Sequence, residues 1–303
     1  MTFRFGFQST AADLHGVLNR VRAAEAAGFD IFQVGDHIGA EVSPLASLAA
    51  AAAVTERIRL GTLVLNNDLR HPVVLAQEVA TLDHVCDGRL ELGIGAGHSF
   101  TEYEAVGKPF DPPAIRKERL AESVRILRSL FDGRPTSDQG QHYALNSATV
   151  LRPKQEHLPI LVGVNGKAAL TRAAQLADIV APTMLARTLP DGQHHEVRWE
   201  AARLDETVSW IRDAANAAGR SVSLHALVQA VVVTEDRQRE GKAIATQHGM
   251  ALSDVLTTPF LCLGTHEEIA DHLMRCRQRW GIEYYTVRVI EEFAPVMRHL
   301  RSA

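Results

Sequence analysis

Short apolar segments alternate with helical periodicity along almost the whole 303-residue chain, and this alternation restricts the folds open to it. The clearest unit is Arg57–Gly97. Within it, the β-branched-rich run Ile58–Leu65 predicts a strand buried on both faces, and Pro72 suits the first turn of a following helix. Asp87-Gly88 predicts a turn before a further strand over Leu90–Ile94. Two parallel strands joined by a helix form a right-handed crossover, so this unit predicts a parallel α/β fold.

The same pattern predicts eight strands, most of them followed by a helix. The predicted strands are Phe3–Gln8, Ile31–Gly35, Ile58–Leu65, Leu90–Ile94, Ile160–Val164, Asp178–Ala181, Val222–Thr234 and Tyr284–Val289. Eight strands in a chain of this length suit a closed, TIM-type parallel β/α barrel. An open doubly wound sheet normally carries G-x-G-x-x-G after its first strand, and the sequence after Gln8 lacks it. With no linker, repeat or low-complexity tract, residues 1–303 are interpreted as one domain.

Three segments depart from the regular alternation. Between strands four and five, a helix and the polar segment Thr136–Leu151 predict an excursion outside the barrel. Thr183–Val197 is predicted to be a loop. Glu235–Gly281 is predicted to be mostly helical, with a break near Pro259 and Gly264.

Composition narrows the function classes. The net charge of −4 comes without any basic run, so nucleic acid is not an expected partner. The predicted first strand begins almost at the first residue, and Ala49–Val54 is too short to cross a bilayer, so we expect neither a signal peptide nor a membrane span. His194-His195 lacks a third ligand at metal spacing, so we expect no metal site. We interpret the three scattered cysteines as reduced packing residues in a cytoplasmic protein: Cys86, Cys262 and Cys276.

Polar residues follow several of the predicted strands. Asp36-His37 ends strand two and is either a solvated strand end or an acid–base group, because imidazole titrates near neutrality. Gly93-x-Gly95-x-Gly97 resembles half of a dinucleotide fingerprint, but the third glycine has the wrong spacing. The loop Gly163–Lys167 is either an ordinary turn or an anion seat at a helix start.

The sequence also resembles a known family. The stretch GTLVLNNDLRHPVVLAQEVATLDHVCDGRLELGIGAG is similar to the luciferase-like flavin and deazaflavin oxidoreductases, and most of all to the actinobacterial branch that uses coenzyme F420. The resemblance returns in FDIFQVGDH, RKERLAESVRILRSLFDG, PILVGVNGKAALTRAAQLADIVAP and RWGIEYYTV. It therefore extends over nearly the whole chain.

The resemblance implies a cofactor site. In relatives that use F420, the pair equivalent to Asp36 and His37 lies beside the reactive ring. The strand end that matches Leu63-Val64 usually contains a cis peptide bond between non-proline residues, which supports the flat ring from behind. Asn66 would then face the pyrimidine-like edge of the ring, where its amide can donate and accept hydrogen bonds.

Two further loops belong to this implied site. In relatives the backbone at Ala96 and Gly97 approaches the ring. The cofactor phosphate is held by residues that match Gly163, Asn165, Gly166 and Lys167. His98 stands where the sugar-phosphate dehydrogenases of the group carry glutamate and where many members of this branch carry tryptophan. It is thus a second acid–base group, a substrate contact, or neither.

The resemblance implies a hydride transfer to or from the deazaflavin. The hypothesis is reduction of an activated C=C or C=N bond in a small molecule or a modified peptide, with His37 supplying or relaying the proton. The alternatives are an FMN-dependent monooxygenase that uses reduced flavin and oxygen, and a flavin-binding barrel without catalysis. Relatives are commonly homodimers, and we expect the same here.

Overall fold

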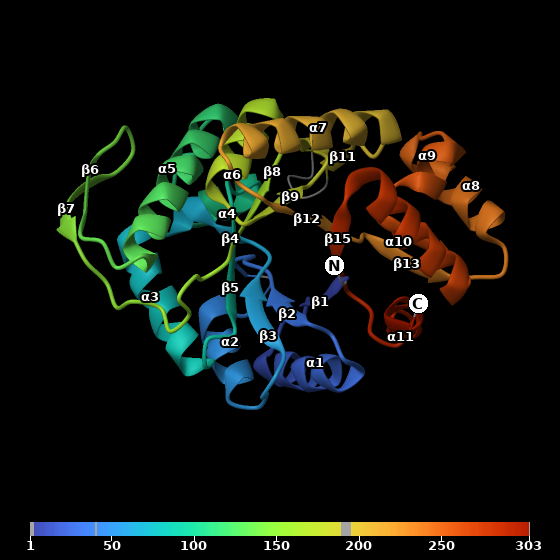
Figure 1. Ribbon diagram of the computed structural model, residues 1–303, viewed down its shortest axis with the longest axis horizontal. Helices are drawn as coiled ribbons and strands as arrows, with labels where there is room; N and C mark the ends of the chain where they lie inside the picture. Colours follow the sequence, from blue (N-terminus) through green and yellow to red (C-terminus); the bar gives the residue numbers. More distant parts are fainter. Residues whose placement is uncertain (1–2, 40, 189–194, 303) are drawn as a thin grey trace.

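The computed structural model describes residues 3–39, 41–188 and 195–302, and within these ranges eight parallel strands close into a barrel surrounded by helices (Figure 1). The first and last barrel strands pair with each other, and β3 pairs with β5, so no edge is left open. This confirms the predicted TIM-type barrel. In order around the barrel the strands are β1 (Arg4–Ser9), β2 (Ile31–Val34), β3 (Arg59–Thr62), β5 (Leu90–Gly95), β8 (Ile160–Val164), β9 (Ile179–Pro182), β12 (Ser223–Leu227) and β15 (Ile282–Val287).

Helices cover the outside of the barrel, and their ends follow local sequence signals. The Asp13 side chain accepts a hydrogen bond from Gly16 N–H at the start of α1, and Thr265 and Glu268 form a capping box at the start of α10. The helices are α1 (Leu14–Ala27), α2 (Pro44–Ala52), α3 (Pro72–Val85), α4 (Phe100–Ala105), α5 (Pro113–Phe131), α6 (Lys167–Leu176), α7 (Ala201–Ala217), α8 (Arg237–His248), α9 (Leu252–Thr257), α10 (His266–Trp280) and α11 (Ala294–Ser302), with a 3₁₀ turn, η1 (Asn67–Leu69). None of the described helices combines the length and the apolar character that a bilayer span requires.

The third predicted strand, Ile58–Leu65, is interrupted. β3 ends at Thr62, the Leu63-Val64 peptide bond is cis, and the chain resumes as β4 (Leu65–Asn66), which pairs with β5. The cis bond confirms the prediction made from the family resemblance. The prediction of a single uninterrupted strand was wrong, because an apolar run does not reveal a break in the hydrogen-bond ladder of the backbone.

The seventh predicted strand, Val222–Thr234, is two strands in different sheets. β12 belongs to the barrel, whereas β13 (Ala230–Val233) pairs in parallel with β14 (Leu261–Gly264) outside it. The prediction was wrong because one apolar run can serve two sheets. β14 also occupies the predicted break within Glu235–Gly281, which is otherwise helical. The last barrel strand begins and ends two residues earlier than predicted, so Arg288 lies just beyond β15.

The excursion between β5 and β8 is confirmed. It comprises α4, α5 and an antiparallel hairpin of β6 (Thr136–Gln139) and β7 (Ala144–Ala148), which projects at the left of Figure 1. The predicted loop Thr183–Val197 instead carries β10 (Leu185–Thr188) and β11 (His195–Val197), a short antiparallel pair whose mixed sequence gave no strand signal. The histidine pair considered as a metal ligand falls in this segment, and His194 lies outside the described residues.

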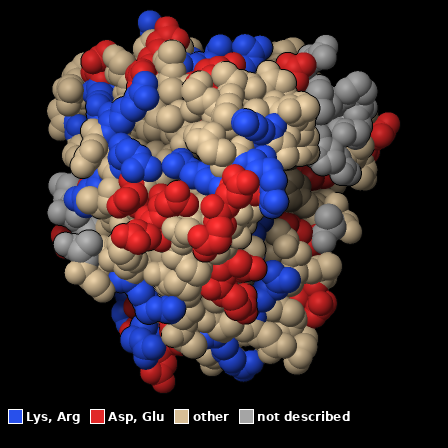
Figure 2. Space-filling model, turned by 90° about the vertical axis from the view of Figure 1, so that its right-hand side faces the viewer, with Lys and Arg blue, Asp and Glu red and all other residues tan. Residues whose placement is uncertain are grey.

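The barrel interior is closed at the end where the strands begin. Glu91 accepts hydrogen bonds there from Arg4 Nη2 at 2.9 Å and from the Tyr284 hydroxyl at 2.8 Å, so this buried charge is paired. Tyr284 also belongs to the apolar cluster of the interior, whose buried members are Ile31, Leu63, Leu161, Ile179, Ala181 and Tyr284. The opposite end, where the strands stop, is left for chemistry. On the outer face shown in Figure 2, acidic and basic side chains lie interspersed.

Candidate functional site

The predicted site residues gather at one rim of the barrel. Asp36 and His37 follow β2, the Leu63–Asn66 segment follows β3, Ala96–His98 follows β5, and Gly163–Lys167 ends β8 and begins α6. Parallel strands place all of their carboxyl ends on the same side, so four segments far apart in sequence share this rim. That these residues bind a cofactor stays a prediction.

His37 is paired with an acidic residue that the sequence did not single out. Its Nδ1 lies 2.7 Å from Oε1 of Glu102 in α4, and this hydrogen bond raises the pKa of His37. The ring of His98 is stacked on that of His37, with 5.4 Å between centroids and 22° between planes. The two proposed catalytic histidines thus lie together. The sequence gave no signal for Glu102, because His98, four positions before it, precedes the first residue of α4.

The carboxylate of Asp36 is engaged by two neighbours. Its Oδ2 accepts a hydrogen bond from the backbone N–H of Asn66 at 2.8 Å, and its carboxylate forms an ion pair with Arg70, with Nη2 2.9 Å from Oδ1. The carboxylate is almost fully buried, so this pair fixes β4 to the end of β2. In this structure Asp36 positions the segment that is predicted to carry the cofactor.

Three glycines surround the side chain of Val64. A Cβ on Gly95 would lie 2.8 Å from Val64 Cγ2, and one on Gly93 would lie 1.9 Å from the carbonyl oxygen of Thr62. Gly163 faces the same valine, at an ordinary contact distance of 3.5 Å. Leu63 is held from inside the barrel, because Gln8 Nε2 donates to its carbonyl oxygen at 2.6 Å. The glycines thus leave room for the Val64 side chain, and the Leu63-Val64 segment together with these glycines is called the floor of the rim below.

Asn66 is buried beside the floor with one polar atom unpaired. Its Oδ1 accepts from Asp68 N–H at 3.1 Å and from the Tyr103 hydroxyl at 3.3 Å, whereas its buried Nδ2 has no acceptor among the described residues. Gly97 lies against this amide with φ +71°, and an added Cβ would approach the Tyr103 hydroxyl to 2.4 Å. Only glycine fits at this position.

The excursion helix α5 holds the glycine loop in place. Arg116 Nη1 donates to the carbonyl oxygens of Ala96, at 3.2 Å, and Gly97, and its Nε donates to that of Asp111 at 2.9 Å. Two of these three hydrogen bonds from one buried guanidinium order the glycine loop, which contains no regular structure, and the third fixes the guanidinium to the chain just before α5. The sequence gave no sign of this role, because Arg116 stands among other charged residues of a surface helix.

The start of α6 has the features of an anion seat. Gly166 precedes the helix with φ +86°, and the first turn is capped by no side chain. The Asn165 side chain is occupied, since its Oδ1 accepts from Met184 N–H at 2.8 Å and its Nδ2 donates to the carbonyl oxygen of Leu185 at 2.9 Å. Lys167 is exposed, with Nζ 5.5 Å from the centre of the Trp210 ring.

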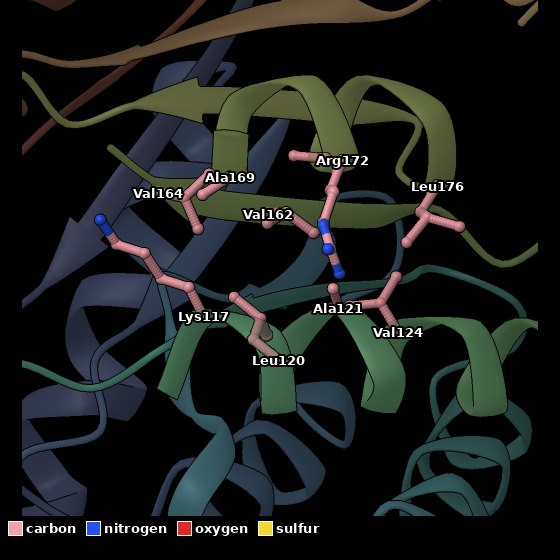
Figure 3. A pocket seen from close by; sticks show the side chains of 10 residues that line it. Lys117, Leu120, Ala121, Val124, Val162, Val164, Ala169, Arg172 and Leu176 are labelled. Carbon is pink, nitrogen blue, oxygen red and sulfur yellow. The ribbon is translucent and has the colours of Figure 1, made fainter. Parts of the chain in front are cut away.

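A second lysine, which the sequence did not single out, reaches the same loop. Lys117 of α5 donates from Nζ to the carbonyl oxygen of Asn165 at 2.8 Å, and burial lowers its pKa. Figure 3 shows it beside Val164, at one end of a narrow and mostly apolar cavity between α5 and α6. This cavity lies on the outer side of β8, so it is separate from the barrel rim. Within the described ranges there is no group of three or more His, Cys, Asp or Glu side chains that could hold a metal ion.

Comparison with known proteins identifies the family of this chain. The model of the luciferase-like monooxygenase family matches residues 1–284. The chain belongs to this family. Among the relatives of this luciferase-like protein is the F420-dependent glucose-6-phosphate dehydrogenase of Nakamurella multipartita, 33% identical over 219 residues, which are 67% of this chain and 64% of the relative. The match thus spans less than two thirds of the length of that relative.

Solved structures show the same barrel as this luciferase-like protein. The coenzyme F420-dependent tetrahydromethanopterin reductase of Methanopyrus kandleri superposes with a TM-score of 0.77 at 19% identity, covering 98% of this chain and 97% of the other. An F420-dependent secondary alcohol dehydrogenase with an F420–acetone adduct superposes with a TM-score of 0.78 at 17% identity, covering 99% and 98%. At such low identity the likeness shows the shared fold alone.

Proposed function

We propose that this protein is an oxidoreductase that transfers a hydride between coenzyme F420 and a small organic or peptide-derived substrate, most simply by reducing an activated C=C or C=N bond. The observation that carries the proposal is the Glu102–His37 pair, which lies at the same barrel rim as the apolar floor. A proton-transfer group beside a seat for a planar ring is the arrangement that such a reaction needs. The F420-dependent names of the curated relatives support the choice of cofactor.

The residues of the rim fit a planar ring with an anionic tail. Val64, Gly95 and Gly163 offer the flat surface, and the unpaired Asn66 Nδ2 offers a donor to a polar ring edge. The uncapped first turn of α6, with Gly166 before it, offers backbone N–H groups to a phosphate. Lys117 and Lys167 add positive charge on this side of the rim.

When bound, the deazaflavin supplies two-electron hydride chemistry at C5, and it reacts poorly with oxygen because it lacks the flavin N5. The residues of this chain supply the proton. Because Nδ1 of His37 is engaged by Glu102, Nε2 is the atom left to hold or move a proton. The raised pKa increases the protonated fraction of the ring at any given pH, which suits His37 to act as the acid in the reducing direction. His98, stacked on it, lies close enough to contact the same substrate.

Cofactor binding and turnover test the proposal in two steps. The protein is titrated with reduced F420 and with reduced FMN, and hydride transfer is followed by the F420 absorbance with a panel of activated enones and imines. We expect micromolar or tighter binding of F420 and slower turnover, by about 10²- to 10⁴-fold, in His37→Ala. Tight binding of FMN alone, with oxygen uptake on adding substrate, would overturn the proposal in favour of a flavin-dependent monooxygenase.

A flavin-dependent monooxygenase is the second candidate function, because the family model itself carries the description monooxygenase. It would require reduced FMN and would consume oxygen in step with substrate. A barrel that binds the cofactor without catalysis would instead show unchanged behaviour in His37→Ala.

A further inference from the structure

Arg288 occupies the part of the rim that the proposed cofactor site does not use. It follows β15 directly, so its side chain starts at the carboxyl end of the barrel, between the ends of β1 and β12. Its Nε donates to Oε1 of Gln8 at 2.9 Å, and its Nη1 donates to Oε1 of Gln229 at 3.3 Å. The guanidinium is half-buried and fixed by two neutral amides.

The charge of Arg288 is not balanced by an ion pair. Among the described residues no carboxylate oxygen lies within 4.0 Å of it, whereas Arg70 is paired with Asp36 and Arg119 with Asp68. The buried Arg116 also lacks an ion pair, but three backbone carbonyl oxygens satisfy its guanidinium. Glu41 is close enough to favour the charged guanidinium but forms no ion pair with it. A half-buried cation held only by glutamine oxygens is costly unless an anion completes it.

Arg288 is tied to the floor of the rim through one residue. Gln8, which accepts from Arg288 Nε, donates from its own Nε2 to the carbonyl oxygen of Leu63 at 2.6 Å. The Leu63-Val64 peptide is the one expected to support the cofactor ring. A ligand group bound to Arg288 therefore has a fixed position relative to that floor.

The position of Arg288 separates it from the anion seat at α6. Around the barrel, β15 is three strands away from β8, and it stands opposite β5. The tail of a cofactor anchored at Gly166 would therefore lie at the β8 side of the rim, away from Arg288. An anion on Arg288 is therefore part of the second reactant.

The local charge favours a carboxylate over a phosphate. One guanidinium, with the Glu41 carboxyl nearby, can compensate a single negative charge but not a dianion. Nη2, which donates to no acceptor among the described residues, together with Nη1 forms an edge that suits the two oxygens of a carboxylate. The amide of Gln229 is exposed and can turn to allow this contact.

We propose that Arg288 binds a carboxylate on the substrate and so orients the substrate over the floor formed by Leu63 and Val64. The class of substrate is then an unsaturated or otherwise reducible carboxylic acid. This inference rests on the proposed function, since it assigns the second reactant of that same reaction.

The test uses matched acid and amide pairs on the F420-loaded protein. Acetate, benzoate and cinnamate are compared with acetamide, benzamide and cinnamamide by calorimetric titration, with phenyl phosphate as a dianionic probe. We expect at least one acid to bind at least tenfold more tightly than its amide, and phenyl phosphate to bind more weakly than benzoate. Arg288→Gln removes the preference, whereas the exposed α1 variant Arg22→Gln retains it.

Three outcomes would overturn the inference: equal binding of every acid and its amide, a preference retained in Arg288→Gln, or tighter binding of phenyl phosphate than of benzoate. Arg288→Lys keeps the charge but loses the planar fork, and it provides the comparison if the glutamine variant does not fold. F420 affinity is measured separately on each variant. If the wild type does not bind F420, the proposed function is contradicted. If it binds F420 but shows no preference for acids over amides, only the role of Arg288 is contradicted.

Discussion

Nδ1 of His37 lies 2.7 Å from Oε1 of Glu102, although 65 positions separate these residues in the sequence. The histidine comes from the end of β2 and the glutamate from α4, the first helix of the excursion. The excursion therefore contributes directly to the predicted catalytic group, and the contact has consequences for pH dependence.

Replacing Glu102 with glutamine should lower the pKa of His37 toward its ordinary value, because the hydrogen-bonding carboxylate is the main cause that raises it. The basic limb of the pH–rate profile should move to lower pH, since the protonated ring is lost earlier. Histidine-ring NMR titration of wild type and Glu102→Gln measures the change directly. An unchanged His37 titration would show that the carboxylate does not control this proton.

The same pair makes stability depend on pH with a defined sign. The folded-state pKa of His37 is higher than that of the unfolded chain, so the stabilisation is complete below the unfolded value and is lost as pH rises through the folded value. Denaturant unfolding across this range should show a decline in wild type that is smaller in Glu102→Gln. Parallel curves for the two proteins would exclude the linkage.

Asp36→Asn should destabilise the protein by about 3 kcal/mol, because it leaves Arg70 without its buried partner. Urea unfolding measures this difference. The matched control is Asp132→Asn, which removes an exposed ion pair with Arg134 and should cost less than about 0.5 kcal/mol. A similar loss in both variants would mean that the Asp36 carboxylate does not fix β4.

Much of the fold could be predicted because the barrel strands repeat the same apolar pattern between helices. The predictions failed where one apolar run changes sheet, as between β12 and β13, or where short mixed segments pair, as in β10 and β11. Periodicity describes which face of a segment is apolar and not which strand lies next to it. The cis bond at Leu63-Val64 came only from the family resemblance, since nothing in those two residues demands it.

For the site, sequence reasoning found residues that follow strands and missed those brought in by helices. Glu102, Arg116 and Lys117 act at the rim through α4 and α5, and in the sequence they stand among ordinary charged helical residues. The depth of burial that makes them significant is a tertiary property. The same holds for Arg288, whose position depends on where β15 ends.

Gly97→Ala and Gly107→Ala compare two glycines of similar conformation. Gly107 has φ +66° with no atom within 4 Å of an added Cβ, so alanine there should cost only about 1 kcal/mol for the left-handed backbone. Gly97→Ala should cost about 2 kcal/mol more, because its Cβ would meet Asn66 and Tyr103. Thermal unfolding and F420 titration measure both effects. Equal costs would show that the contact with Asn66 is easily relieved.

Lys117→Met should weaken F420 binding about tenfold, because it removes the hydrogen bond that orders the carbonyl oxygen of Asn165. Lys167→Gln should weaken it only about two- to threefold, since that ammonium is exposed and lies over Trp210. Fluorescence titration with F420 at low and high salt separates the two contributions. A larger effect from Lys167 would place the main positive charge at the helix start itself.

The three cysteines should be inert in the folded protein. All are buried, and burial raises the pKa of Cys276 to about 12 and also raises that of Cys86. A thiol reagent at pH 8 should therefore detect almost no thiol before unfolding and three afterwards. Rapid reaction of any one of them in native buffer would contradict the burial.

The hydrogen bonds from Arg116 to the carbonyl oxygens of Ala96 and Gly97 couple the position of α5 to the conformation of the rim. A shortened homologue that lacked this helix would retain all eight barrel strands but lose the hydrogen bonds that shape the rim. Grafting the excursion between members of the fold should accordingly transfer rim geometry together with the graft, and leave the barrel beneath it unaltered.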